Sequence, residues 1–345
     1  MTKWTIPLFL GAACLLLPRI PVDAKPPCPI GISMNLPAKG TIKTLIADLQ
    51  ATKALGANLQ FISCSWKDLE PSPSEYVWKP VVEPCRGLGS LGFTEILTIK
   101  TLDTNNRNLP SDLQSKPFDS PEVLERFGHM LRAMIPQLPP NVKAISLGNE
   151  VDVYLGLHPD ETEPFMALMD RGRQVVKELR PDLPVAITAT FDGLRDRPAI
   201  VTRLNKQTGV VFMTYYPMGH DFHVHTPKSV GGDFDRIARF AGMKRVFLQE
   251  IGYPASPMLR SSDGLQAQFV DAVFAQLGKH PATFAGANFF LLYDFTAEQL
   301  DTFVKYYGVG APQFRAFLAT LGFRHTDSAP RPAWKHFQTN IRSLR

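Results

Sequence analysis

The feature that most constrains the fold of this chain is a regular alternation between short apolar runs and segments with helical spacing. Runs rich in β-branched and aromatic residues recur eight times along the sequence: Ile30–Leu36, Asn58–Ser63, Thr94–Thr101, Val142–Leu147, Val185–Thr190, Val210–Tyr216, Arg245–Gln249 and Gly286–Tyr293. Between them, apolar residues recur every three or four positions in Ile42–Leu55, Pro121–Ile135, Pro164–Leu179, Phe234–Ala241, Leu265–Leu277 and Pro312–Leu321. Strands that are apolar almost throughout are typical of a parallel sheet buried on both faces.

This alternation predicts an α/β protein built as a single-domain (β/α)8 TIM barrel. A length of 345 residues suits one barrel, because such domains run to about 250 residues and beyond. A doubly wound nucleotide-binding sheet is the competing fold, but the segment Ile32–Pro37 after the first strand lacks the glycines of its phosphate-binding turn. We therefore expect one catalytic barrel over residues 25–345.

The N-terminus has the layout of a secretory signal peptide over residues 1–24. Lys3 precedes an apolar run from Trp4 to Leu17, and the small residue Ala24 stands before the expected cleavage site. A retained membrane anchor is the alternative, but about 14 apolar residues are short for a span that needs about 20. We expect a secreted or periplasmic protein without stable membrane insertion.

Net charge bears on the possible binding partners, and cysteine content bears on disulfide and metal bonding. The net charge of +5 is small for this length, and no block of like charges is present, so nucleic acid is not an expected partner. Cleavage of the signal peptide would leave Cys28, Cys64 and Cys85, an odd number. Either Cys64 pairs with Cys85 or all three are buried thiols. Their spacing does not fit a metal site.

Two glutamates follow apolar strands at positions where a barrel carries its active site. Glu150 ends the run after Val142–Leu147, and Glu250 ends the run that begins at Arg245. The C-terminal ends of barrel strands meet at one mouth, so both carboxyl groups are expected there. Two carboxyl groups about 5 to 5.5 Å apart are what a retaining glycosidase needs, one as the nucleophile and the other as the acid/base.

The residues around these glutamates resemble those of the clan A glycoside hydrolases. Asn149-Glu150 after the fourth strand and a lone glutamate after the seventh match that clan. The resemblance implies that Glu150 is the acid/base, that Asn149 binds a sugar 2-hydroxyl and that Glu250 is the nucleophile. Gly148-Asn149-Glu150, Thr214-Tyr215-Tyr216-Pro217 and Glu250-Ile251-Gly252-Tyr253-Pro254 are most similar to the endo-β-1,4-galactanases of glycoside hydrolase family 53.

A tyrosine hydroxyl that donates to Glu250 would help to keep it ionised. Tyr215 and Tyr216 both end the sixth strand, and neighbouring strand residues face opposite ways. One should therefore point into the barrel mouth and the other into packing, and we predict Tyr216 for the mouth.

Other residues just beyond strand ends are candidates for substrate binding. Trp66 and Tyr293 are predicted to offer flat apolar surfaces to sugar rings, although packing in the barrel mouth is an alternative for each. Lys100 and Asp192 could bind hydroxyl groups, or could be solvated loop ends.

We expect a retaining glycoside hydrolase that acts on a β-linked oligo- or polysaccharide without a metal or other cofactor. One alternative is a non-catalytic carbohydrate-binding barrel of the same clan. A less favoured one is a metal-dependent hydrolase that uses His220, His223 and His225, but the other strand ends offer no evident further ligands. The sugar, endo or exo cleavage, and the oligomeric state are left open by the sequence.

Overall fold

The predicted apolar runs form one parallel sheet in the computed structural model, which describes residues 28–344. The strands of this sheet are β1 (Ile30–Ile32), β2 (Leu59–Ser65), β3 (Thr94–Lys100), β6 (Val142–Ser146), β7 (Val185–Ala186), β8 (Thr188–Thr190), β9 (Val210–Tyr215), β10 (Arg245–Ile251) and β11 (Phe284–Phe289). A separate antiparallel hairpin consists of β4 (Leu102–Asp103) and β5 (Asn106–Arg107). The predicted signal peptide lies outside the described residues.

The sheet closes into a barrel through the fifth predicted strand, Val185–Thr190, which the structure divides into β7 and β8. The strand order is β7-β6-β3-β2-β1-β11-β10-β9-β8, so β7 and β8 stand at the two edges. Only Ile187 separates β7 from β8, and the two pieces pair with β6 and β9 respectively. One interrupted strand therefore joins both edges, which confirms the predicted single-domain (β/α)8 barrel.

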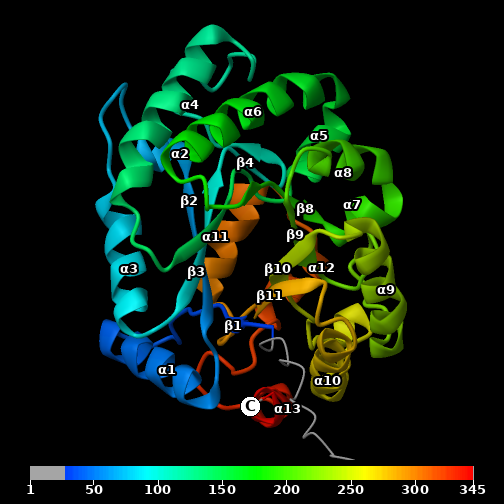
Figure 1. Cartoon of the computed structure of the whole chain (residues 1–345). Coiled ribbons are helices and arrows are strands. Elements are labelled where there is room, and N and C mark those ends of the chain that lie inside the picture. The colour runs from blue at the N-terminus through cyan, green and yellow to red at the C-terminus, as the bar shows by residue number, and fades with distance from the viewer. Residues whose placement is uncertain (1–27, 345) are drawn as a thin grey trace, which may run out of the picture.

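Helices surround the strands in the order that alternation requires (Figure 1). They are α1 (Ile42–Leu55), α2 (Trp66–Leu69), α3 (Lys79–Ser90), α4 (Pro121–Met134), α5 (Val151–Leu157), α6 (Thr162–Leu179), α7 (Phe191–Asp196), α8 (Pro198–Asn205), α9 (Val230–Ala241), α10 (Asp263–Lys279), α11 (Ala297–Tyr307), α12 (Pro312–Ala319) and α13 (Pro332–Ser343). Helix α3 forms although Pro84, Gly87 and Gly89 give its sequence a low helix propensity.

Local capping explains where several helices begin and end. The Ser262 hydroxyl accepts a hydrogen bond from the Leu265 amide at the start of α10, as an N-cap should. Ser120 also precedes its helix, but its side chain makes no capping bond. Gly56 ends α1 at φ 123°, a conformation that side chains disfavour.

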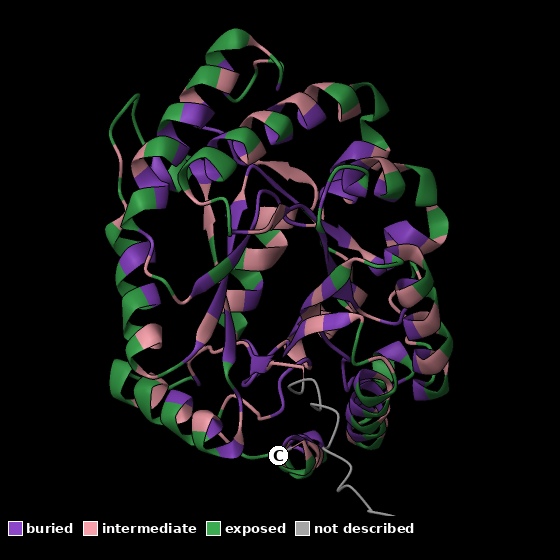
Figure 2. Ribbon diagram, in the orientation of Figure 1, coloured by how far each residue is buried: buried purple, intermediate pink, exposed green. Residues whose placement is uncertain are grey.

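The apolar residues lie in distinct layers. Leu59, Ile96, Ala144 and Phe212 belong to a cluster contributed by strands alone. Two larger clusters combine residues of the strands with residues of the surrounding helices. In Figure 2 the strands are mostly buried, whereas the helices carry an exposed outer face.

A long connection after β11 covers part of the barrel mouth. We call residues 297–319, which include α11 and α12, the cap. The side-chain amides of Asn105 and Asn106, in the β4–β5 hairpin, donate hydrogen bonds of 2.8 and 3.0 Å to the carbonyl oxygens of Tyr307 and Tyr306. In Figure 1 α11 is visible through the ring of strands. The cap therefore reaches from the eighth barrel strand to the loop after the third.

Cys28, Cys64 and Cys85 are all free thiols, so the possible Cys64–Cys85 bridge is not formed. Among residues 28–344, no helix has the length and apolar character needed to cross a membrane.

Candidate active site

Both predicted glutamates line one pocket at the C-terminal ends of the barrel strands. The pocket has a volume of about 670 Å³, within the range of small-molecule sites. Lys100, Asn149 and Thr214 line it beside Glu150 and Glu250. The pocket thus brings together carboxyl, amide, ammonium and hydroxyl groups from several different strands.

Glu150 occupies a strained backbone position between β6 and α5. Its φ of 49° and ψ of 39° are left-handed, a conformation that costs a non-glycine residue roughly 1 to 2 kcal/mol. The hydroxyl groups of Thr214 and Thr104 donate hydrogen bonds of 2.7 and 2.8 Å to its two carboxyl oxygens. Strain of this kind persists where surrounding contacts fix the chain, and it is common at functional sites.

Thr104 is itself left-handed, at φ 55°, which is unusual for a β-branched residue. Its amide donates a 2.9 Å hydrogen bond to the carbonyl oxygen of Asn149, next to Glu150 in the chain. The two strained residues thus support each other across the gap between the third and fourth barrel strands.

Glu250 lies where β10 shifts its register against β9. The pairing is interrupted between Leu248 and Glu250, so Gln249 is the extra residue of a β-bulge. The Tyr216 hydroxyl donates a 2.7 Å hydrogen bond to Glu250 Oε2. Bulges re-aim side chains, and this one places Glu250 in the pocket while the adjacent Gln249 remains buried.

Gln249 cross-links the polar floor of the pocket, by which we mean Glu150, Glu250, Asn149 and the polar residues hydrogen-bonded to them. Its side-chain oxygen accepts hydrogen bonds of 2.9 and 2.8 Å from the hydroxyls of Thr98 and Thr188. Its side-chain nitrogen donates a 2.7 Å bond to Asn149 Oδ1. These bonds fix the orientation of the Asn149 amide, which is the group predicted to contact a sugar hydroxyl.

Asp103 forms a second buried hub, at the end of β4. It accepts hydrogen bonds from the Asn149 amide at 3.0 Å, the Lys100 ammonium at 2.9 Å and the Tyr306 hydroxyl at 2.9 Å. Only 2% of Asp103 is exposed, so the charge of Lys100 offsets that of a carboxylate taken out of water. Asp103 therefore links the polar floor to α11 of the cap.

The two glutamates lie in different electrostatic surroundings, which act differently on their pKa values. Burial, and next the negative charge of Glu250, raise the pKa of Glu150 to about 8. Burial also raises the pKa of Glu250, but the Tyr216 hydrogen bond and the positive charge of Lys100 act in the opposite direction. Glu150 therefore favours its protonated form near pH 7, whereas Glu250 has a hydrogen bond and a nearby positive charge that act against the effect of burial on its pKa.

Most predicted binding residues lie in this pocket. Asn149, Tyr216, Lys100 and Asp192 all line it. Burial raises the pKa of Asp192 to about 6, although Arg195 contacts its carboxylate at 3.0 Å. Tyr215 instead donates its hydroxyl to Asp233, as alternation along the strand predicts for the neighbour of Tyr216.

Trp66 does not reach the pocket, and its prediction as a sugar platform is wrong. The residue is fully buried, its indole N–H donates a 2.9 Å hydrogen bond to Glu70, and its ring packs 4.9 Å from that of Phe127. It begins α2, and the helical turn directs its side chain towards α4 instead of the barrel mouth.

Tyr293 is likewise not a platform. Only 2% of it is exposed, and its hydroxyl donates a 2.9 Å hydrogen bond to Asp48 of α1. The aromatic residue that the eighth strand presents to the pocket is Phe290, directly after β11. The sequence did not single it out, because the predicted apolar run continues to Tyr293 whereas the strand ends at Phe289.

The three clustered histidines do not converge on a point. His220 contacts Asp196 at 3.2 Å, whereas His223 contacts Asp221 at 2.6 Å. Within residues 28–344, no group of three or more His, Cys, Asp or Glu side chains is arranged to hold a metal ion. His220 lines the pocket and is largely exposed.

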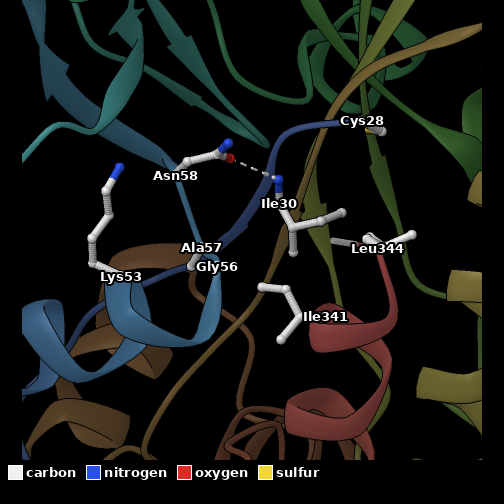
Figure 3. Close-up of a pocket in the computed structure, with 8 residues that line it drawn as sticks. All are labelled: Cys28, Ile30, Lys53, Gly56, Ala57, Asn58, Ile341 and Leu344. Atoms are coloured by element: carbon white, nitrogen blue, oxygen red, sulfur yellow. Dashed lines mark hydrogen bonds between the residues drawn. The ribbon is translucent and has the colours of Figure 1, made fainter. Parts of the chain in front are cut away.

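A second pocket, of about 490 Å³, lies near the start of β1 and the ends of α1 and α13 (Figure 3). Asn58 accepts a 3.2 Å hydrogen bond from the Ile30 amide there, and Lys53 is the charged residue of the lining. None of the described residues that line this pocket carries a carboxylate, so residues 28–344 place no acid–base pair there.

Comparisons with known proteins agree on the fold. No family model and no curated protein sequence matches the chain. Among solved structures, the exo-β-1,4-mannosidase Op5Man5 from Opitutaceae bacterium strain TAV5 superposes with a TM-score of 0.73 at 17% identity, over 92% of this chain and 59% of that chain. The present chain thus spans less than two thirds of that protein.

A GH5_18 protein from Streptomyces cattleya, solved in complex with Manβ1-4GlcNAc, gives a TM-score of 0.73 at 16% identity, over 92% of this chain and 81% of the other. A β-glucosidase designated 1317 gives 0.64 at 14% identity, over 87% and 88%. At these identities the likeness establishes the (β/α)8 barrel fold alone. It does not support the more specific similarity to family 53 galactanases.

Proposed function

We propose that this protein is a retaining β-glycoside hydrolase. One observation carries the proposal: Glu150 and Glu250 line the same pocket at the barrel mouth, where burial raises the pKa of Glu150 to about 8, while the Tyr216 hydroxyl and the Lys100 charge oppose the effect of burial on the pKa of Glu250. Pairs of carboxyl groups whose pKa values are driven apart are typical of an acid and a nucleophile that work together.

In the first step, a Glu250 carboxylate oxygen bonds to the anomeric carbon while the bond from that carbon to the leaving oxygen breaks. Glu150 gives its proton to the leaving oxygen as it departs. In the second step, Glu150 takes a proton from water, whose oxygen bonds to the anomeric carbon and displaces Glu250. Asn149, held by Gln249 and Asp103, is positioned to bind a hydroxyl group beside the reacting carbon.

The similar structures suggest which sugars to test. Their descriptions name a β-1,4-mannosidase, a Manβ1-4GlcNAc complex, a β-glucosidase and a β-glucuronidase. We propose a β-linked sugar of this kind as substrate, and the predicted signal peptide supports export of the enzyme to the periplasm or the medium.

The stereochemistry of the first product tests this proposal. Wild-type protein is incubated with 4-nitrophenyl β-mannoside, β-glucoside, β-galactoside and β-glucuronide, and the anomer released first is identified by proton NMR before mutarotation. We expect the β-anomer from the sugar that is cleaved. Release of the α-anomer would contradict double displacement, and binding without cleavage across the panel would favour a carbohydrate-binding barrel.

A further inference from the structure

The pocket has an apolar wall that the chemistry above does not use. Every lining residue that follows Glu250 in the chain is apolar or aromatic: Phe290, Leu291, Phe295, Phe303, Tyr307, Val309, Phe314, Phe317 and Leu318. We call this set the apolar wall. Most of it comes from the cap, and Phe222 of the loop after β9 packs against it.

The wall faces the pocket as well as the interior of the cap. Phe290, Phe303, Tyr307, Val309 and Phe317 are only partly buried. Large apolar side chains that are half-exposed inside a concave site are typical of ligand-binding surfaces. Packing of the cap accounts for the fully buried members, but it does not require this exposed carbon surface.

The wall begins beside the nucleophile. The ring of Tyr216 lies 5.2 Å from that of Phe317 and 6.5 Å from that of Phe290, in edge-to-face contacts. The hydroxyl of the same Tyr216 donates to Glu250.

The wall also reaches the acid, because Asn105, which binds the carbonyl oxygen of Tyr307, directly follows Thr104, whose hydroxyl donates to Glu150. A leaving group departs on the Glu150 side of the anomeric carbon, opposite the attacking Glu250, so the Tyr307 end of the wall lies close to its expected place.

The chemistry of the wall is poorly matched to a second sugar. Sugar hydroxyls must keep hydrogen-bond partners when they leave water, or each costs free energy. Among the nine wall side chains, Tyr307 alone carries a polar atom. Tryptophan and tyrosine can stack and still donate, but phenylalanine cannot. None of the described tryptophans, Trp66, Trp78 and Trp334, lines the pocket.

Hydrogen bonds within the protein also hold the wall in place. The hairpin amides of Asn105 and Asn106 bind the backbone at Tyr307 and Tyr306, and the Tyr306 hydroxyl donates to Asp103. A surface that is already ordered loses little entropy on binding, so its apolar contacts can contribute to affinity.

We propose that the substrate is a β-glycoside whose leaving group is apolar, of the alkyl or aryl type, with the sugar bound on the polar floor and the leaving group against the apolar wall. This inference rests on the proposed function and names the substrate class of the same site. The alcohol or phenol leaves with the proton that Glu150 supplies, and water then displaces Glu250 from the sugar and returns a proton to Glu150.

A series of n-alkyl β-glycosides tests the inference. Methyl, butyl, hexyl and octyl glycosides of the sugar that is cleaved best are compared below their micelle-forming concentrations. The longer alcohols are nearly equal leaving groups, so a change in kcat/KM from butyl to octyl reports contact with the chain. Each methylene that becomes buried should raise kcat/KM roughly fourfold. We expect at least a tenfold rise from butyl to octyl, and weaker activity on disaccharides.

Matched variants locate the contact. Phe303→Asn should reduce the octyl-to-butyl ratio, whereas Phe303→Leu should largely keep it. Val309→Thr changes shape little and adds a hydroxyl, so it serves as a second variant if Phe303→Asn folds poorly. Val304→Thr is the control, because Val304 packs within the cap but does not line the pocket. Circular dichroism and melting temperature check the fold of each variant.

The outcomes separate the two proposals. A rising ratio that falls in Phe303→Asn and Val309→Thr, but not in Val304→Thr, supports the apolar leaving group. Hydrolysis that is independent of chain length, or faster on disaccharides, overturns this inference and leaves the glycosidase proposal standing. No hydrolysis of any glycoside by folded wild-type protein overturns the proposed function and this inference with it.

Discussion

The two sides of the pocket are built in different ways. The polar floor stands on the ends of barrel strands, where Gln249 and Asp103 cross-link residues of five strands or strand extensions through short hydrogen bonds. The cap belongs to one long connection and is attached across the mouth by the asparagines of the β4–β5 hairpin, by the hydroxyl of Tyr306 on Asp103, and by aromatic contacts with Tyr216 and Phe222. A rigid scaffold suits reacting groups that must be placed accurately, whereas a connection can vary with little effect on the barrel. We infer that the floor determines the reaction and the cap determines which molecule is accepted.

The largest expected loss of activity follows from a substitution in the polar floor. Glu250→Gln removes the nucleophile, so kcat on every β-glycoside should fall by at least about 10⁴-fold. The variant should still fold, and a 2-fluoro glycoside inactivator should label Glu250 of the wild type but leave the Glu250→Gln protein unlabelled. The exposed Glu125→Gln on α4 is the control and should keep full activity. Peptide mapping by mass spectrometry gives the labelled residue, and a label on another carboxylate would contradict the assignment.

The next effect depends on the leaving group. Glu150→Ala should slow cleavage of alkyl glycosides by about 10² to 10⁴-fold, the usual contribution of a general acid. The first step on a 4-nitrophenyl glycoside should be much less affected, because that leaving group needs no proton. Azide, which needs no deprotonation, should then restore turnover and give a glycosyl azide of retained configuration. Equal losses on both substrates without rescue by azide would mean that Glu150 is not the acid/base.

A third effect concerns stability and pH. The folded protein binds a proton at Glu150 more tightly than the unfolded chain does, so this group favours folding at low pH. That contribution is lost as the pH rises from about 4.5 towards the folded pKa of about 8. Glu150→Gln should therefore be more stable than wild type at pH 8, by about 2 to 4 kcal/mol at 1.36 kcal/mol per pKa unit.

Melting curves of wild type, Glu150→Gln and Glu125→Gln at pH 5 and pH 8 would measure this difference. An equal gain in stability at both pH values would show that ionisation of Glu150 does not destabilise the folded protein. The same pKa predicts that kcat/KM of the wild type falls above about pH 8, when Glu150 loses its proton.

The smallest effect is expected where the two sides meet. Tyr306→Phe removes the hydroxyl that joins the cap to Asp103, while Asn108 loses one hydrogen-bond partner. We expect a loss of about 1 kcal/mol in stability and less than tenfold in kcat. KM for the octyl glycoside should rise more than KM for the methyl glycoside. Equal changes for both substrates would argue against a separate role for the cap.

The candidate site shows where prediction from sequence succeeds and where it ends. Glu150, Glu250 and Tyr216 were found because each follows an apolar strand, and barrel closure brings strand ends together. Trp66 and Tyr293 follow strands too, but both are buried outside the pocket. Position in the chain gives the end of the barrel at which a residue lies. It does not give the side-chain direction once the strand has ended.

Thr104, Asp103 and Gln249 were not predicted, for related reasons. Thr104 and Asp103 belong to a hairpin after β3 that has no strong strand pattern of its own. Simple alternation places Gln249 on the side opposite Glu250, and only the bulge brings its amide beneath the site. A one-residue shift in register depends on packing around the closed barrel, and this packing cannot be predicted from the neighbouring residues in the sequence.

The sequence by itself determined the barrel and its two carboxylates, because strand periodicity and chain order are local properties that closure converts into proximity. Tertiary structure alone decided the environment of those carboxylates and the apolar wall opposite them. The proton affinity of Glu150 depends on Glu250, Thr214 and Thr104, which lie 100, 64 and 46 residues away in the chain. The wall exists because α11 crosses the mouth to a hairpin some 200 residues earlier in the chain. Electrostatic and apolar contacts depend on distance in space, and for these residues the fold sets that distance.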